Sequence, residues 1–391
     1  AGWAVDDQAA LEFAEEFYRE MISGQKFGEA VRNARRKIFN AYRSHTNTWG
    51  AYQCYGDPFY QLSSGENGVH QVEEFLVKEE VEIELINLNQ QLDSQAMEDD
   101  RVLEILEKLE KELKVNGIQS GKITECFAVL FAKVGLYDRA VPYFEQLFQT
   151  EKAGFSFKAL ELWCNISCKH AIEVYEAGNK TEEDRKKTLD TIDQAAKRLQ
   201  SLNEFGVTAE RMSLLGSAYK RKLLLLKNEA VQYDKSLKDA VASYQKASEM
   251  MHHQDNYPLV NWVQLAKMHS LRNSKAKLKA ETEMVSLILA CKEEEVKKRD
   301  QQNDPWSFFG LANLALTELV LDEGKTPNLG SEVEESFLGI FERVGSKGHL
   351  KAQLEHLTIL IEGLESVNQD GAKKLHTQLD QLRERLKPLD F

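Results

Sequence analysis

The sequence predicts a mainly α-helical protein in which a long array of paired helices follows a shorter N-terminal segment. Only 22 glycines and 6 prolines occur among 391 residues, so turn-forming residues are scarce. Apolar residues recur at helical spacing from about residue 68 to residue 387. A composition that is 42% hydrophobic and 29% charged is typical of globular proteins, and it excludes wholesale disorder and a bundle of membrane helices.

Charge and cysteine content narrow the expected partners and compartment. The formal net charge of −13 would repel phosphate backbones and anionic lipid, so we expect neither nucleic acid nor membrane as a partner. The five cysteines are sparse, odd in number and mostly flanked by apolar residues, which is typical of reduced thiols, and we expect a cytoplasmic location. No leader peptide and no apolar run of about 18 residues is apparent.

The first 62 residues differ in composition from the rest, and the linker-like Ser63-Ser64-Gly65 marks the boundary. Residues 1–5 resemble the tail of a buried strand, so we expect a fragment or a processed product. Asp6 and Asp7 precede an amphipathic helix that ends at Gly24. A second helix over 28–42 carries a basic cluster, which is either a solvated face or a site for an acidic partner. Alternating aromatic and small residues over 49–58 predict a short final strand and a turn. The basic cluster consists of Arg32, Arg35, Arg36 and Lys37.

The order of these pieces resembles the C-terminal end of CHAT domains, the caspase-like peptidase family. The resemblance covers about 60 residues and is carried by the following residues in this order: Gly2-Trp3-Ala4-Val5-Asp6-Asp7, Phe17-Tyr18, Ala34-Arg35, and Trp49-Gly50-Ala51-Tyr52 with Tyr55-Gly56-Asp57-Pro58. It implies a truncated C-terminal piece of a caspase-like α/β domain, whose catalytic His and Cys would lie upstream of residue 1. No catalytic residue is therefore expected in this chain.

The resemblance also implies a substrate-facing segment at the N-terminus. Trp3 would pack on the substrate backbone, and Asp6 or Asp7 would face a basic P1 side chain, although one of these acids could simply cap the following helix. We expect Cys54 to be a buried structural thiol and His45 to be a loop residue.

The helical remainder resembles an irregular tetratricopeptide array. In the first helix of each repeat, large residues are followed by a small one at a fixed spacing. This pattern begins at residues 124, 163, 212, 262 and 306. The spacings of 39 to 50 residues exceed the ideal period of about 34. Gly216 is the small residue of the third unit, and Tyr244 lies on its second helix. Leucines between 354 and 382 predict a closing helical hairpin. The curved inner face of such an array is an extended surface for a peptide or protein partner.

Competing chemistries are less well supported. Cys164, Cys168 and His170 could begin a zinc site on one helix face, but no fourth ligand is apparent and core packing is favoured. Nucleotide-binding and serine-hydrolase motifs are absent. We expect no metal and no cofactor.

These expectations combine into one organisation and two functional hypotheses. We expect the C-terminal part of a CHAT domain at 1–62, connecting helices at 63–117, and irregular tetratricopeptide-like repeats with capping helices at 118–387. The first hypothesis is a fragment of a cysteine endopeptidase with a regulatory array, inactive in isolation, which the family resemblance associates with bacterial defence. The alternative is a non-catalytic helical-repeat scaffold for protein–protein interaction.

Overall fold

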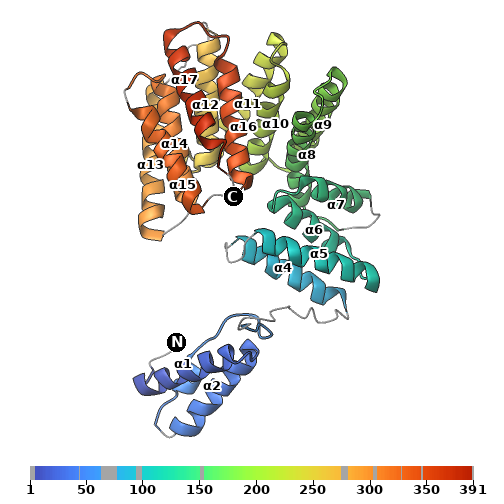
Figure 1. The fold of residues 1–391 in the computed structure, drawn as a ribbon, viewed down its shortest axis with the longest axis vertical. Helices are drawn as coiled ribbons and strands as arrows, with labels where there is room; N and C mark the ends of the chain where they lie inside the picture. Colours follow the sequence, from blue (N-terminus) through green and yellow to red (C-terminus); the bar gives the residue numbers. More distant parts are fainter. Residues whose placement is uncertain are drawn as a thin grey trace. The chain divides into compact units, whose positions relative to one another are not determined.

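The computed structural model describes residues 5–43, 45–62, 77–93, 99–149, 154–273, 281–302, 306–326, 328–344 and 347–389. In these ranges the chain forms helices α1 to α17 and no β-strand, so the predicted mainly α fold is confirmed (Figure 1). The chain divides into two compact units, an N-terminal unit at Ala1–Phe75 and a repeat unit at Leu76–Phe391.

The N-terminal unit contains α1 (Asp7–Ile22), α2 (Phe27–Tyr42) and the single-turn α3 (Thr48–Ala51). Asp6 caps α1, because its carboxylate accepts a hydrogen bond from the backbone N–H of Ala9 at 2.9 Å. The two long helices pack through a small core of Ala9, Phe13, Ala34 and Ile38.

The predicted strand over 49–58 is wrong: residues 48–51 form a helical turn, and residues 52–55 follow without regular structure. Two of the aromatic rings in this segment, those of Trp49 and Tyr52, pack on helices, whereas Tyr55 is 85% exposed. Tyr52 stacks on Phe13 with ring centroids 4.6 Å apart, and Trp49 meets Phe39 edge to face. The expected strand tail at residues 1–5 lies almost entirely outside the described residues.

The repeat unit consists of helices joined by short connections, and neighbouring helices pack as antiparallel pairs (Figure 1). Its helices are α4 (Lys78–Asp93), α5 (Asp99–Asn116), α6 (Gly121–Lys133), α7 (Tyr137–Gln149), α8 (Phe157–Ala177), α9 (Glu182–Leu202), α10 (Ala209–Leu225), α11 (Ala230–Met250), α12 (Asn256–Arg272), α13 (Glu281–Gln302), α14 (Trp306–Asp322), α15 (Leu329–Val344), α16 (Lys347–Leu364) and α17 (Asp370–Leu386).

The small residue of the third repeat has the role that the pattern predicts. A Cβ added at Gly216 of α10 would lie 2.7 Å from the ring of Tyr244, which is fully buried on α11. Only glycine lets the two helices approach this closely. Gly135, at the turn between α6 and α7, adopts φ +80°, a left-handed conformation that glycine tolerates without strain.

The C-terminal hairpin of α16 and α17 forms as expected, but it does more than close the end of the stack. α17 packs on α15, whereas α16 contacts α10 and α12, which precede it by many helices in the sequence (Figure 1). Since α10 and α12 are first helices of their repeats, α16 covers their inner surface. This contact encloses polar side chains between α16 and the inner helices.

Candidate functional site

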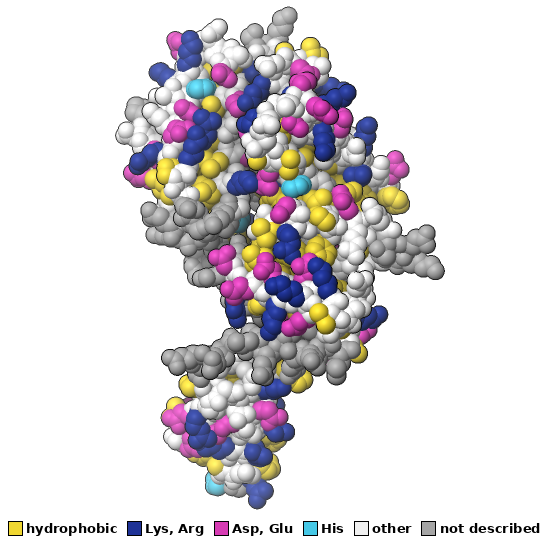
Figure 2. All heavy atoms as spheres, turned by 45° about the vertical axis from the view of Figure 1, so that its right-hand side comes forward, with side chains coloured by type: hydrophobic (Ala, Val, Ile, Leu, Met, Phe, Trp, Pro, Cys, Tyr) yellow, Lys and Arg dark blue, Asp and Glu magenta, His cyan; other side chains and the backbone are white. Residues whose placement is uncertain are grey.

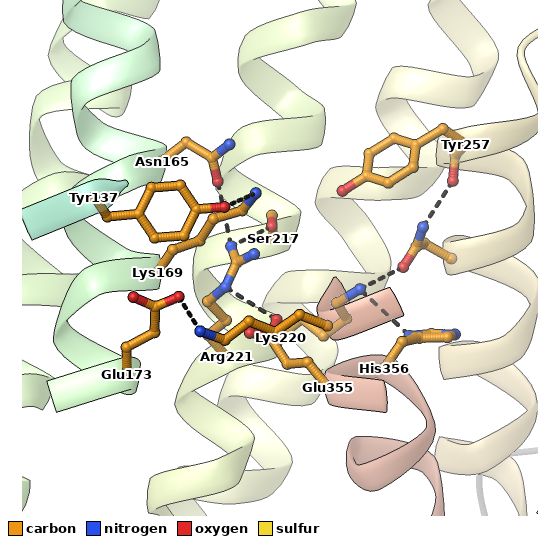
Figure 3. Close-up of polar contacts among 12 residues, drawn as sticks. Tyr137, Asn165, Lys169, Glu173, Ser217, Lys220, Arg221, Tyr257, Glu355 and His356 are labelled. Atoms are coloured by element: carbon orange, nitrogen blue, oxygen red, sulfur yellow. Dashed lines mark hydrogen bonds and ion pairs between the residues drawn. The ribbon is translucent and has the colours of Figure 1, made fainter. Parts of the chain in front are cut away.

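The inner helices α8, α10 and α12 and the returning helix α16 enclose a network of charged and polar side chains (Figure 3). Lys220 and Arg221 of α10 lie at its centre, and both are about 5% exposed. Buried charges are costly unless they are paired or hydrogen-bonded, so each of these contacts is structurally significant.

Lys220 joins α10 to both α12 and α16. Its Nζ lies 2.8 Å from Oδ1 of Asn261 and 3.3 Å from Nδ1 of His356. The other ring nitrogen of His356 meets Oε1 of Gln264, whose amide nitrogen donates to the hydroxyl of Thr317 at 2.7 Å. This pattern fits a neutral imidazole in which Nε2–H donates and Nδ1 accepts. The chain of contacts therefore connects α10, α16, α12 and α14.

Burial sets the protonation of this network. It lowers the pKa of Lys220 to about 7, against an ordinary value of 10.5. Burial, followed by the charge of Lys220, also lowers the pKa of His356 well below its usual value of 6.5. His356 is therefore neutral at physiological pH, while Lys220 titrates close to neutrality.

Arg221 forms a second connection between α10 and α16. Its guanidinium is 3.0 Å from a carboxylate oxygen of Glu355, and its Nη1 donates to the hydroxyl of Ser217 at 2.6 Å and to Oδ1 of Asn165 at 3.3 Å. The side chain of Arg221 is 6% exposed and that of Glu355 is 20% exposed. This ion pair, partly shielded from water, fixes α16 on α10 and α8.

A cavity of about 350 Å³ lies beside this ion pair, between α8, α10 and α16. Its walls combine apolar side chains with basic and acidic ones. Its charged lining residues are Lys169, Lys180, Arg221, Lys227, Lys351, Glu173, Glu176, Glu355 and Glu362.

Lys169 of α8 and Tyr137 of α7 form a pair on one side of the cavity (Figure 3). The ammonium of Lys169 donates to the hydroxyl of Tyr137 at 3.2 Å and lies 5.3 Å from the centre of its ring. Burial, and then the charge of Arg221, lowers the pKa of Lys169 to about 8. Burial raises the pKa of Tyr137 to about 12, so its hydroxyl stays protonated. The pair offers hydrogen-bond donors to an anion.

The predicted substrate-facing residues belong to the N-terminal unit. Trp3 lies outside the described residues. Asp6 is exposed and caps α1, and its own N–H donates to the hydroxyl of Thr48 at 2.9 Å. Asp7 is exposed in the first turn of α1. The capping alternative is thus seen for Asp6, and contact with substrate stays a prediction for all three residues.

Two members of the basic cluster of α2 bond to parts of this unit outside α2, whereas Arg32 and Arg36 bond to Glu29 and Asn33 of α2 itself. Nη2 of Arg35 donates to the backbone carbonyl of Tyr52 at 2.6 Å, and Lys37 pairs with Glu16 of α1 at 2.8 Å. These contacts hold α2 on its neighbours. Cys54 is half-buried and packs on the small core between α1 and α2.

The two thiols considered as metal ligands are core residues. Cys164 and Cys168 are at most 1% exposed, pack with Leu215 and Ala218 of α10, and have pKa values raised by burial to about 12. Burial among apolar side chains thus favours the protonated form of both thiols, and the two residues pack as part of the core. The described residues contain no group of three or more His, Cys, Asp or Glu side chains that could hold a metal ion.

Sequence reasoning missed the polar network. A signal was present, because Lys220 and Arg221 interrupt the apolar run of α10 between Ala218 and Leu223. Likewise, Glu355 and His356 stand between leucines of α16. Charged residues inside an otherwise apolar helix indicate buried partners, but the pattern does not say where those partners lie.

Elsewhere on the repeat unit, acidic, basic and apolar side chains are interspersed on the face drawn in Figure 2. No helix in the described residues is both long and apolar enough to cross a membrane.

Comparison with known proteins identifies both parts of the chain. Residues 2–57 match the family model of the CHAT domain, and residues 136–266, which run from the turn before α7 into α12, match the model described as Tetratricopeptide Repeats-Sensor. No curated protein sequence matches the chain. A solved structure, the human IFIT1 dimer with PPP-AAAA, aligns over 98% of this chain and 95% of its own at 13% identity and a TM-score of 0.23. The chain thus contains a piece of a CHAT domain followed by tetratricopeptide-repeat-sensor repeats.

Proposed function

We propose that this chain is the C-terminal part of a caspase-like cysteine endopeptidase, and that its repeat array controls proteolysis by binding a regulator. The observation that carries the proposal is the order of the two matched families on one chain, a CHAT piece at residues 2–57 and sensor repeats at residues 136–266. A sensor joined covalently to a peptidase module is positioned to regulate it, and bacterial defence is the setting that we propose for this regulation from the family resemblance.

The contact of α16 with the inner helices supports a regulatory array. Tetratricopeptide proteins generally bind partners on the inner face. Here α16 covers α10 and α12 through charged contacts that include Lys220 and Arg221. A protein partner would therefore bind the inner surface that α16 leaves open, or would displace α16. Helix displacement of this kind is a common form of switching.

In this proposal Trp3, Asp6 and Asp7 contribute to the substrate cleft of the complete peptidase. Asp7 is the better candidate for a basic P1 side chain, because its carboxylate is exposed whereas that of Asp6 accepts the capping hydrogen bond. The catalytic His and Cys would be supplied upstream of residue 1.

The test compares peptide cleavage by three proteins: the complete protein with its upstream sequence, the same protein without residues 118–387, and the 391-residue chain alone. We expect cleavage of Arg-P1 peptides by the complete protein, a change of at least tenfold on removal of the array, and no cleavage by the chain alone. An unchanged rate without the array would contradict regulation. Absence of cleavage by the complete protein, whether or not the array is present, would favour the non-catalytic scaffold.

A further inference from the structure

The cavity between α8, α10 and α16 carries more positive than negative charge. Its lining holds five basic side chains and four carboxylates, and the carboxylates are all engaged in ion pairs. The pairs are Lys351 with Glu173, Lys180 with Glu176, Arg221 with Glu355, and Lys227 with Glu362. Lys169 remains, and within the described residues its ammonium has no carboxylate partner.

Lys169 is also more buried than the other three lysines of the cavity. Lys180, Lys227 and Lys351 have side chains that are 47%, 47% and 63% exposed and stand at the rim. Lys169 is half-buried, and its bonding partner is the neutral hydroxyl of Tyr137. The carboxylates of Glu355 and Glu173 act on the charge of Lys169 without forming an ion pair with it. A cation that is shielded from water attracts an anion more strongly than a solvated surface lysine does.

The rest of the cavity is suited to an apolar group. Ile172 of α8, Leu224 of α10 and Leu354 of α16 line it together with Ala352. A volume of about 350 Å³ falls at the lower end of the range of about 300–1,000 Å³ that is usual for small-molecule sites. Such a cavity accommodates a small molecule and not a folded partner.

We propose that this cavity binds a small molecule bearing one carboxylate or phosphate group on an apolar body, with the anionic group bonded to the ammonium of Lys169 and the hydroxyl of Tyr137. This inference deepens the proposed function and rests on it, because the ligand would be the signal that the sensor repeats detect. The walls come from both α10 and α16, so the bound molecule would hold α16 on the inner face. Ligand binding would thus be coupled to access of a protein partner.

Three probes with the same apolar body test the proposal: hexyl phosphate, hexanoate and the uncharged 1-hexanol. Dissociation constants are measured on the 391-residue chain at pH 7 by ligand-observed NMR. We expect at least one anion to bind at least tenfold more tightly than hexanol, since a charge-assisted hydrogen bond is worth that much. Comparing the two anions distinguishes a carboxylate site from a phosphate site.

Variants assign the effect to Lys169. Lys169→Met should remove the preference for the anion, and Lys169→Arg should retain most of it. Lys187→Met, which removes an exposed lysine of α9 away from the cavity, is the matched control and should change nothing. Raising the pH from 7 to 9 should weaken anion binding but not hexanol binding, because Lys169 loses its proton near pH 8.

The proposal is overturned if neither anion binds more tightly than hexanol, or if Lys169→Met binds the anions as wild type does while remaining folded by circular dichroism. These measurements require no peptidase activity. Anion binding with unregulated or absent cleavage would leave the site in place and reject the proposed function, whereas regulated cleavage without anion binding would reject only the site.

Discussion

The two units of this chain bury their apolar residues to very different extents. The N-terminal unit encloses a small core around Phe13 and Ile38, and it leaves Leu11, Tyr18 and Ile22 of α1 at least 55% exposed along one side. The repeat unit contains a core that runs from α10 to α17, with large side chains such as Phe337 and Phe341 fully enclosed.

Only the repeat unit encloses a core that is complete without a further domain. Burial of apolar surface is the main source of stability, at about 25 cal/mol for each Å² removed from water. Helix pairs that stack on one another complete each other's cores, so the array needs nothing else. The exposed side of α1 is instead what we expect of a domain piece that packs against the remainder of its domain. If so, damage to one unit should leave the other folded.

Removal of a buried ring from the array should have the largest effect. Phe144 of α7 is fully buried, and Phe144→Ala should lower the free energy of unfolding of the repeat unit by about 3–5 kcal/mol. Hydrogen exchange of peptides from each unit, recorded at increasing temperature, would measure the loss of stability of that unit. Phe13→Ala is the counterpart in the other unit and should loosen residues 7–51 alone. If either variant lowered the stability of both units equally, the two units would not be independently folded.

Next in size is the loss of the ion pair between α10 and α16. Glu355→Gln leaves Arg221 without its counterion and should cost about 2–3 kcal/mol, somewhat less than for a fully buried pair because Glu355 is 20% exposed. Glu365→Gln, at an exposed position just after α16, is the control and should have no measurable effect. Chemical denaturation monitored by circular dichroism gives both values. Equal midpoints for the two variants would show that the pair does not hold α16.

The stability of the repeat unit should rise with pH between about 7 and 10. Lys220 has its pKa lowered to about 7 in the folded protein, so over this range the unfolded chain binds the extra proton and folding is favoured as pH increases. The slope from this group should approach about 1.4 kcal/mol for each pH unit. It is measured as the difference between wild type and Lys220→Met, with the N-terminal unit as the internal control. If stability changed with pH equally in wild type and Lys220→Met, Lys220 would be solvated and its pKa would not be lowered in the folded protein.

The smallest effect concerns the cap of α1. Asp6→Ala should destabilise the N-terminal unit by about 1 kcal/mol, whereas Asp6→Asn should not, because asparagine caps equally well. Asp7→Ala serves as the comparison, since Asp7 lies inside the helix. Circular dichroism, recorded while the N-terminal unit unfolds, ranks the variants by the stability of that unit. A larger loss for Asp7→Ala than for Asp6→Ala would contradict the capping role.

Sequence patterns predicted the helices well and the site poorly. The periodicity of apolar residues predicted the helical array, and Gly216, the small residue of the third unit, lies at a close approach to the ring of Tyr244. These are local features set by neighbouring residues. The contact of His356 with Lys220 joins positions 136 residues apart, and no local pattern encodes it.

The strand predicted over 49–58 failed for a related reason. Alternation of aromatic and small residues does not by itself specify a strand, because a strand also requires a hydrogen-bonding partner for its backbone. In the described structure the carbonyl of Tyr52 accepts a hydrogen bond from Arg35 instead of from a neighbouring strand. Tertiary context decided the conformation, as is common for short aromatic segments.

Hydrogen exchange of the 391-residue chain, compared with the complete protein that includes the upstream sequence, tests the central claim most directly. We predict that residues 5–62 exchange far faster than the array in the 391-residue chain and become strongly protected in the complete protein, while residues 121–386 keep the same protection in both. Strong protection of residues 5–62 in the 391-residue chain itself would contradict the account, because that unit would then be an independent module and not a piece of a larger domain.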